Sequence, residues 1–350
     1  MKYIKGYDGL RAFSILFVVL THMGLDQLIP DSDFMQQRAW LLFSGLTGVQ
    51  IFFSLSGFLI TRILLIEKKQ TGTISFKNFY IRRFLRLLPP LVVFYIAIAI
   101  LMKMVMIRGS AVGFVMGVTY IYNFIPKQFY TGELGHMWSL AVEEQYYLLW
   151  PVVLVFTPKA RKLIGIAAVL LFLCIIAKYI LPDMQYGTET LGDKFLVDRW
   201  FVPAVAPIMI GSLFAILVYK YCYRLKDLLH ENNKVLLLAL LLYAAPLYLS
   251  DALLSISYLF IATGVSLFLT WLFFNQTSGA GKFLDFAPLR YIGKISYGIY
   301  VYQGFFLRTG PAEGLSVQQF PYNIILTIVI AIISYELLEK PVLKLKNKFR

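Results

Sequence analysis

The first apolar stretch of the chain carries two ionisable side chains, Arg11 near its start and His22 near its end. They are eleven positions apart, and that spacing returns to nearly the same helix face about 16 Å further along the axis. Ionisable groups in an apolar helix usually face a bundle interior and have a function. A neutral imidazole can transfer a proton near pH 7 or act as a nucleophile. We therefore expect His22 and Arg11 to be catalytic; the alternative is a His22 that only packs against a backbone carbonyl.

Two adjacent carboxylates, Glu143 and Glu144, enter a second apolar helix within the segment 135–151. Adjacent helical residues point about 100° apart, so they face different neighbours. The predicted topology puts Glu143 at the depth of His22, where a carboxylate could orient the imidazole as in a catalytic triad. The alternative is a buried polar network that fixes helix packing. We take Glu143 as catalytic, and Trp138 and Glu144 from the same segment as substrate-binding.

Arg83 and Arg86 are three residues apart, so both guanidinium groups lie on one face of a helix at the predicted cytoplasmic surface. Such a pair suits bidentate capture of phosphates. Arginines at an inner membrane interface also serve topology, which is the competing explanation. The pattern predicts an anionic ligand, such as a phosphate-bearing cofactor, at Arg83 and Arg86.

A short apolar stretch near the end of the chain carries a polar stripe that could bind a sugar or lie at the membrane interface. The stripe consists of Tyr297, Tyr300, Tyr302 and Gln303. From it we take Tyr297 and Gln303 as candidate substrate-binding residues. His136 and His230 fall in predicted loops and are assigned no role.

The elements that must position these residues are membrane helices. Of 350 residues, 59% are hydrophobic and 15% are charged, whereas soluble proteins average about 25% charged residues. The net charge of +14 is spread over short loops, which indicates orientation in a membrane rather than a nucleic-acid partner. The two cysteines, Cys174 and Cys222, have no metal-ligand or disulfide-framework spacing.

The hydropathy pattern predicts an all-α fold, a polytopic membrane helix bundle of about ten transmembrane helices plus a short re-entrant or interfacial helix at 111–125. Pro89 and Pro90 fall in the first turn of the third span, where proline is tolerated. Small residues at 54–57 predict close helix packing. We expect one domain over 1–350, cytoplasmic termini, a basic tail at 340–350 and no cleaved signal peptide. The spans are 10–29, 40–65, 87–107, 138–156, 163–180, 200–219, 235–249, 253–274, 295–307 and 322–338.

Together these residues resemble the acyltransferase family 3 membrane proteins, the bacterial O-acyltransferases of surface polysaccharides. Five blocks occur in order, from Gly6 to Pro341. The blocks are YDGLRAFSILFVVLTH, IFFSLSGFLITR, FYIRRFLRLLPP, HMWSLAVEEQYYLLWP, and KISYGIYVYQ followed by ELLEKP. One position departs from the family pattern, because Gln303 stands where members often have a histidine.

The resemblance implies a ten-span domain in the bacterial cytoplasmic membrane. Such a domain moves an acyl group, usually acetyl, from cytoplasmic acyl-CoA to a hydroxyl of a carbohydrate or glycolipid acceptor on the outer side. Carried over by motif, Arg11 and His22 form the R-x10-H pair, Arg83 and Arg86 contact the CoA, and Glu143 is the matching acidic residue. The donor is expected to be acetyl-CoA, without a metal ion. Because no soluble domain is fused, we expect the acceptor to meet the membrane domain itself or a partner.

Two mechanisms remain open at this point. His22 either deprotonates the acceptor hydroxyl or carries the acyl group itself. A transporter or flippase of a sugar or lipid intermediate is the alternative function, and a membrane scaffold is another. Transporters commonly show internal repeat symmetry, which the sequence lacks.

Overall fold

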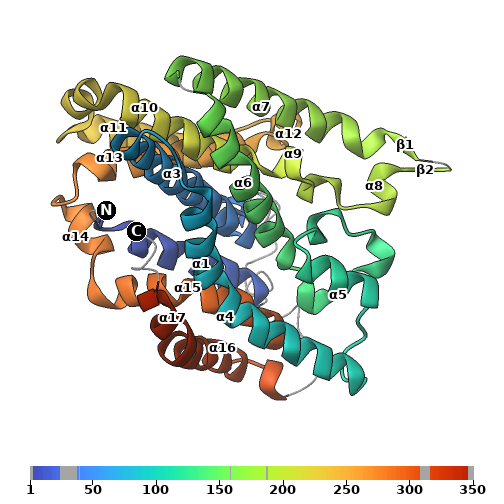
Figure 1. Cartoon of the computed structure of the whole chain (residues 1–350). Coiled ribbons are helices and arrows are strands. Elements are labelled where there is room, and N and C mark those ends of the chain that lie inside the picture. Colours follow the sequence, from blue (N-terminus) through green and yellow to red (C-terminus); the bar gives the residue numbers. More distant parts are fainter. Residues whose placement is uncertain are drawn as a thin grey trace.

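The computed structural model describes residues 3–23, 38, 40–157, 159–186, 188–307 and 316–345, and these fold almost entirely into helices (Figure 1). The predicted all-α class is confirmed in this respect. The longer helices are α1 (Tyr7–His22), α3 (Gly45–Thr71), α4 (Phe76–Lys103), α6 (Met137–Phe156), α7 (Ala160–Ile180), α10 (Ala206–Leu229), α11 (Asn233–Ala244), α13 (Ser257–Phe274), α15 (Ala287–Phe306) and α16 (Tyr322–Ser334).

Short elements connect these helices. The short helices are α2 (Trp40–Phe43), α5 (Ala111–Val118), α8 (Leu191–Lys194), α9 (Phe201–Ala204), α12 (Asp251–Leu254), α14 (Gly279–Leu284) and α17 (Lys340–Leu345). One small antiparallel ribbon pairs β1 (Gln185–Tyr186) with β2 (Glu189–Thr190). The predicted acidic loop at 31–33, the end of the first span and the last part of the basic tail lie outside the described residues.

The described residues contain six helices long and apolar enough to cross a membrane, so the predicted count of about ten is not confirmed. These helices are Gly45–Thr71, Phe76–Lys103, Ala160–Asp183, Ala206–Leu229, Ser257–Phe274 and Tyr322–Leu345. For two predicted spans the difference is one of helix length, which an apolar window does not report, whereas α6 and α15 have 20 residues each and are not among the six. The described part of α1 has 16 residues and α11 has 12, whereas about 20 residues span a hydrocarbon core.

α5 lies in the segment 111–125, where a short re-entrant or interfacial helix is predicted. It has eight residues, about 12 Å of helix, and three single-turn 3₁₀ helices follow it: Tyr122–Phe124, Lys127–Phe129 and Gly132–Leu134. An element of this length cannot cross a core of about 30 Å. This chain of short turns leads directly into α6 and so sets where α6 begins.

α4 begins well before the two prolines. It starts at Phe76, after Ser75 accepts a hydrogen bond from the Asn78 amide at its N-cap. The prediction that Pro89 and Pro90 lie in the first turn is therefore wrong, because both are inside the helix. The consequence for function is that Arg83 and Arg86 lie on a formed helix rather than in a loop.

Glycines allow the central helices to approach closely. A Cβ at Gly57 of α3 would lie 1.9 Å from the Ile208 carbonyl oxygen of α10, and one at Gly211 would lie 2.1 Å from the Ser54 carbonyl oxygen. Backbones this close exclude any larger side chain. The close packing predicted for 54–57 is confirmed, and α3 is fixed at the centre of the bundle against α10, α1 and α13.

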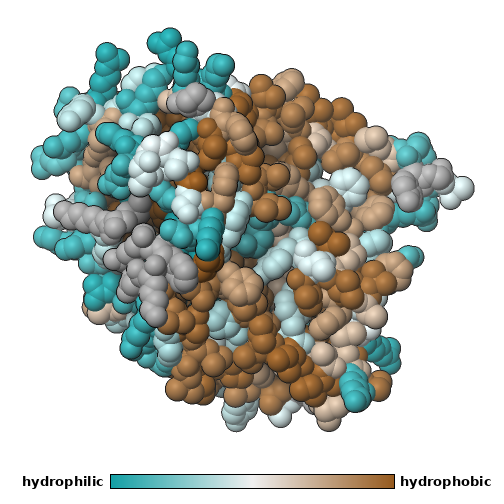
Figure 2. Space-filling view, in the orientation of Figure 1, coloured by the Kyte–Doolittle hydropathy of each residue, from teal (hydrophilic) through white to brown (hydrophobic). Residues whose placement is uncertain are grey.

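Hydrophobic side chains cover much of the molecule, and hydrophilic ones gather at one edge. In Figure 2 the hydrophilic residues lie mainly at the left, where Figure 1 places α14 and the N-terminus. Exposed apolar side chains occur on α4, α7 and α11, for example Ile96, Phe172 and Leu240. Continuous apolar surface of this extent marks a membrane-facing protein.

Candidate active site

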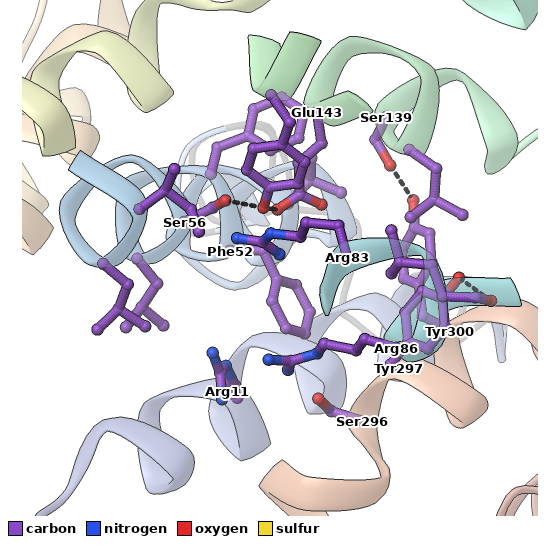
Figure 3. Close-up of a pocket in the computed structure, with 18 of the residues that line it drawn as sticks. Arg11, Phe52, Ser56, Arg83, Arg86, Ser139, Glu143, Ser296, Tyr297 and Tyr300 are labelled. Atoms are coloured by element: carbon purple, nitrogen blue, oxygen red, sulfur yellow. Dashed lines mark hydrogen bonds between the residues drawn. The ribbon is translucent and has the colours of Figure 1, made fainter. Parts of the chain in front are cut away.

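Three guanidinium groups meet at a cavity of about 130 Å³, here called the arginine cavity. Arg11 comes from α1, and Arg83 and Arg86 come from α4, one turn apart. In Figure 3 the side chain of Arg86 extends toward Arg11, and that of Arg83 extends toward Ser56 on α3. Arg86 lies close enough to Arg11 and Arg83 for the like charges to interact. The predicted pairing of Arg83 and Arg86 on one helix face is confirmed.

The described lining of the arginine cavity has three arginines and one carboxylate, and Glu144 and Glu339 act electrostatically on Arg83 and Arg86 from outside this lining. Arg11 Nη1 binds Asp8 Oδ1 at 3.0 Å, and Glu143 is the acidic residue among the described residues that line the cavity. Within the described ranges, Arg83 and Arg86 form no ion pair with a carboxylate. Guanidinium groups without carboxylate partners are suited to an anionic ligand, above all a phosphate.

A hydrogen-bonded chain of three side chains, Glu143, Tyr147 and Ser56, lines one wall of the arginine cavity. The Tyr147 hydroxyl donates to Glu143 Oε1, and the Ser56 hydroxyl bonds to the Tyr147 hydroxyl. Figure 3 labels Ser56 and Glu143, the two ends of this chain. The guanidinium carbon of Arg83 lies 3.9 Å from the centre of the Tyr147 ring, which is a cation–π contact. Glu143 thereby orients Tyr147, and the Tyr147 ring supports Arg83.

His22 lines a second and larger cavity of about 510 Å³, here called the histidine cavity. Its Nδ1 lies 2.7 Å from the Val18 carbonyl oxygen. Because a carbonyl oxygen only accepts, this bond assigns the proton to Nδ1 and leaves the lone pair on Nε2. A ring held in this way presents the nitrogen that a base or a nucleophile needs. Trp138 lines the same cavity.

Three side chains, Val49, Phe53 and Tyr300, line both cavities. The Tyr300 hydroxyl donates to the His136 carbonyl oxygen at 2.9 Å and lies 2.5 Å from the Ser139 hydroxyl oxygen. The partition between the arginine and histidine cavities is therefore one layer of side chains. Its tyrosine is held in place by two hydrogen bonds.

Glu143 does not orient His22 in this structure. Its carboxylate accepts from Tyr147 and lines the arginine cavity, whereas His22 bonds to the backbone of its own helix and lines the histidine cavity. The expectation that Glu143 holds the imidazole is therefore not met among the described residues. The sequence placed both residues at similar depth, but depth does not fix which way α6 is rotated about its axis.

The predicted substrate-binding residues are separated by the fold. Trp138 lines the histidine cavity, and Tyr297 lines the arginine cavity while its hydroxyl donates to the Leu87 carbonyl oxygen at 3.1 Å. Glu144 and Gln303 line neither of these two cavities. Gln303 is completely buried on α15, and within the described part of the chain its amide has no hydrogen-bond partner.

Two residues at the histidine cavity were missed from the sequence. His136, assigned to a loop, is buried at the start of α6, with Nε2 at 3.1 Å from the Val301 carbonyl oxygen. Arg199 falls between the predicted spans 163–180 and 200–219 and was assigned no role, and its side chain also lines the cavity. The available signals were the position of His136 as the first residue of the block HMWSLAVEEQYYLLWP and the presence of an arginine in a loop rich in acidic residues.

In the part of the chain that the structure describes, no group of three or more His, Cys, Asp or Glu side chains could hold a metal ion. The chemistry available at the two cavities is that of guanidinium groups at one and imidazole at the other. Such an arrangement can bind an anionic group at the arginine cavity and move a proton or an acyl group at the histidine cavity.

Comparison with known proteins identifies the family. The "Acyltransferase domain" family matches residues 4–337. "Putative peptidoglycan O-acetyltransferase YrhL" of Bacillus subtilis (strain 168) is 28% identical over 97% of this chain and 55% of its own length. "O-acetyltransferase OatA" of Staphylococcus aureus (strain NCTC 8325 / PS 47) is 28% identical over 98% of this chain and 58% of its own length.

This chain thus spans a little over half the length of these relatives. No solved structure matches the chain. The family match covers nearly all of the described helices and both cavities, including the Arg11–His22 pair and the Arg83–Arg86 pair. The chain therefore belongs to the acyltransferase domain family that its motifs resemble.

Proposed function

We propose that this protein is a membrane O-acetyltransferase that takes an acetyl group from acetyl-CoA at the arginine cavity and delivers it to a carbohydrate hydroxyl at the histidine cavity. The observation that carries the proposal is the pair of cavities along α1, with Arg11 in one, His22 in the other and a single layer of side chains between them. The names of the relatives, O-acetyltransferases, support acetyl as the transferred group.

The donor is oriented by charge. Arg83 and Arg86 bind the phosphates of CoA, with Arg11 at the same cavity. A cavity of about 130 Å³ suits the narrow pantetheine arm of the donor, so the nucleotide stays at the cavity mouth. The pantetheine arm then extends along α1 past Val49, Phe53 and Tyr300. Its length is adequate for the helical rise of about 16 Å between Arg11 and His22.

Acetyl transfer can follow two routes at His22. As a base, Nε2 takes the acceptor's proton while the acceptor oxygen attacks the thioester carbonyl, and the imidazolium returns the proton to the departing CoA thiolate. As a carrier, Nε2 attacks the thioester first and CoA leaves as the thiolate. The acceptor hydroxyl then attacks the acyl-imidazole, and its proton neutralises the thiolate. Both routes require the Nε2 lone pair that the Val18 bond leaves free.

Glu143 acts at the donor rather than at the imidazole. Through Tyr147 it fixes the ring on which Arg83 rests, and its charge offsets part of the guanidinium charge. Trp138 contacts the acceptor in the histidine cavity, and Tyr297 contacts the donor in the arginine cavity. Glu144 and Gln303 remain candidates for substrate binding on the strength of the sequence.

The membrane and its orientation are part of the proposal. Lys and Arg collect on cytoplasmic loops, which places both termini and the arginine cavity on the cytoplasmic side of a bacterial cytoplasmic membrane. The histidine cavity then opens toward the outer side. A relative named for peptidoglycan O-acetylation supports a cell-envelope carbohydrate or glycolipid as the acceptor.

The test is acetyl transfer by the purified full chain in lipid nanodiscs, supplied with radiolabelled acetyl-CoA and cell-envelope glycan. Release of CoA with incorporation of label into glycan, both lost in His22→Ala, is the expected result. A transporter or flippase would turn over no acetyl-CoA. Wild-type protein that neither binds nor consumes acetyl-CoA would therefore overturn the proposal.

A further inference from the structure

We propose that the histidine cavity contains an anion subsite built on Arg199, which binds a carboxylate or phosphate of the acceptor beside His22. This inference rests on the proposed function, because it identifies the class of acceptor as an anionic carbohydrate or glycolipid. Arg199 ends the 3₁₀ helix Val197–Arg199 and lines the same cavity as His22. Its charge acts on His22 electrostatically.

Arg199 is half-buried, and one nitrogen of its guanidinium is buried without a compensating acceptor. Its Nη1 has no hydrogen-bond partner in the described ranges, and none of the described carboxylates forms an ion pair with it. Leaving a buried donor nitrogen of a charged group without a hydrogen-bond partner is costly. The cost is understandable if an anionic ligand completes the site, since arginine binds carboxylate and phosphate groups through two parallel hydrogen bonds.

Aromatic rings hold Arg199 ready for a ligand. The guanidinium carbon lies 5.8 Å from the centre of the Tyr130 ring and 5.6 Å from that of Trp138. Next to it, the Trp200 ring packs against Phe124 and Phe195. The arginine is therefore fixed before a ligand arrives, which lowers the entropy lost on binding.

The other charges at this cavity do not neutralise Arg199. Lys178 and Asp198 also line the cavity. Lys178 Nζ lies 4.3 Å from the centre of the Tyr258 ring, and Lys178 interacts electrostatically with Asp198. These two charges offset each other, so the described lining retains the positive charge of Arg199.

The position of the subsite determines what it does for the reaction. An anionic group bound to Arg199 places the rest of the acceptor along the cavity toward His22, so that a neighbouring hydroxyl can reach Nε2. A neutral sugar lacks this anchor. The subsite therefore selects acidic sugars, or sugars attached to a lipid phosphate, over neutral sugars of the same size.

The test uses wild-type full chain and Arg199→Gln in phosphatidylcholine nanodiscs, with saturating CoA to occupy the arginine cavity. The probes are glucuronate, its neutral counterpart glucose, inorganic diphosphate, and polyprenyl phosphate added to the nanodisc. We expect wild type to bind glucuronate or the phosphate probes, with affinity reduced at least about tenfold in Arg199→Gln. Arg199→Lys should restore part of it, and Arg82→Gln, at a residue that lines neither cavity, should leave it unchanged.

The arms of the test separate the two sources of the anion. Binding of glucuronate without the phosphates assigns an acidic sugar, and binding of polyprenyl phosphate or diphosphate without glucuronate assigns a lipid-linked sugar. In wild-type protein, glucuronate or diphosphate should also protect Arg199 from phenylglyoxal, as read by mass spectrometry, and glucose should not. This second measurement holds even if Arg199→Gln fails to fold.

Absence of anion binding in wild type, or equal binding in Arg199→Gln, would overturn the subsite. The outcome is distinct from failure of the proposed function, which is read separately as CoA release from acetyl-CoA in the same preparation. Protein that binds anions through Arg199 but turns over no acetyl-CoA would keep the subsite and overturn acetyl transfer.

Discussion

Arg11 and His22 lie on one continuous helix, α1, and line two different cavities. A straight helix is a rigid spacer, so the rise of about 16 Å between them is fixed by the backbone. Val49, Phe53 and Tyr300 occupy the partition between the cavities. A substrate that uses both residues must therefore be long and narrow, and an acyl-pantetheine chain has that shape.

Replacing His22 by Ala should abolish acetyl transfer, because the side chain supplies the reactive Nε2. A loss of at least about 10²-fold in rate is expected, the lower end of what a positioned acid–base group contributes. Label transfer from acetyl-CoA in nanodiscs measures it. His230→Ala is the matched control, since His230 is exposed at the end of α10 and lines neither cavity. Full activity in His22→Ala would contradict both routes.

Replacing Arg83 by Gln should weaken donor binding. One lost charged hydrogen bond is worth about 1.5–3 kcal/mol, so the KM for acetyl-CoA should rise about tenfold to a hundredfold. Arg82→Gln is the control from the adjacent position, because Arg82 Nη2 pairs with Glu67 Oε2 at 3.2 Å and lines neither cavity. An equal KM effect in the two variants would show that charge near the membrane, rather than the cavity, attracts the donor.

The local features of the site could be predicted from the sequence. The same-face placement of Arg83 and Arg86 depends only on helix geometry, and the structure confirms it. The same argument brings Arg11 and His22 to one helix. Close packing at Gly57 followed from a run of small residues in an apolar segment.

What the sequence missed depends on contacts between distant segments. Arg199 reaches the cavity because a long connection folds back against Tyr130 and Trp138. Glu143 and Tyr147 share one face of α6, and this face meets Ser56 and Arg83 rather than His22 because the rotation of α6 is set by its neighbours. The predicted count of about ten spans is not confirmed, in part for a related reason: an apolar window does not reveal where a helix breaks.

Substituting Ala for Gly57 should destabilise the bundle. The new Cβ would lie 1.9 Å from the Ile208 carbonyl oxygen, and overpacking of this kind costs about 1–3 kcal/mol. Thermal unfolding in detergent reports the change as a lower Tm. In the control, Gly165→Ala on α7, the Cβ meets nothing within 4 Å, so its Tm should be unchanged or higher, as expected from helix propensity. A Gly57→Ala protein as stable as wild type would contradict the α3–α10 packing.

Two substitutions of Tyr147 separate the contribution of its hydroxyl to donor binding from that of its ring. Tyr147→Phe removes the hydrogen bonds to Glu143 and Ser56 but keeps the ring beneath Arg83. Loss of about 1 kcal/mol should raise the KM for acetyl-CoA about fivefold. Tyr147→Leu also removes the cation–π contact, worth about 0.5–2 kcal/mol, and should raise the KM further.

The control for both Tyr147 variants is Tyr80→Phe. Tyr80 also joins α4 to α6, with its hydroxyl donating to the Leu148 carbonyl oxygen at 3.0 Å, but it lines neither cavity. Its KM for acetyl-CoA should therefore stay at the wild-type value. If Tyr147→Leu behaves like Tyr147→Phe, the ring does not support Arg83 and the hydroxyl chain through Glu143 carries the whole effect. If both behave like Tyr80→Phe, Glu143 has no influence on donor binding and its role must lie elsewhere.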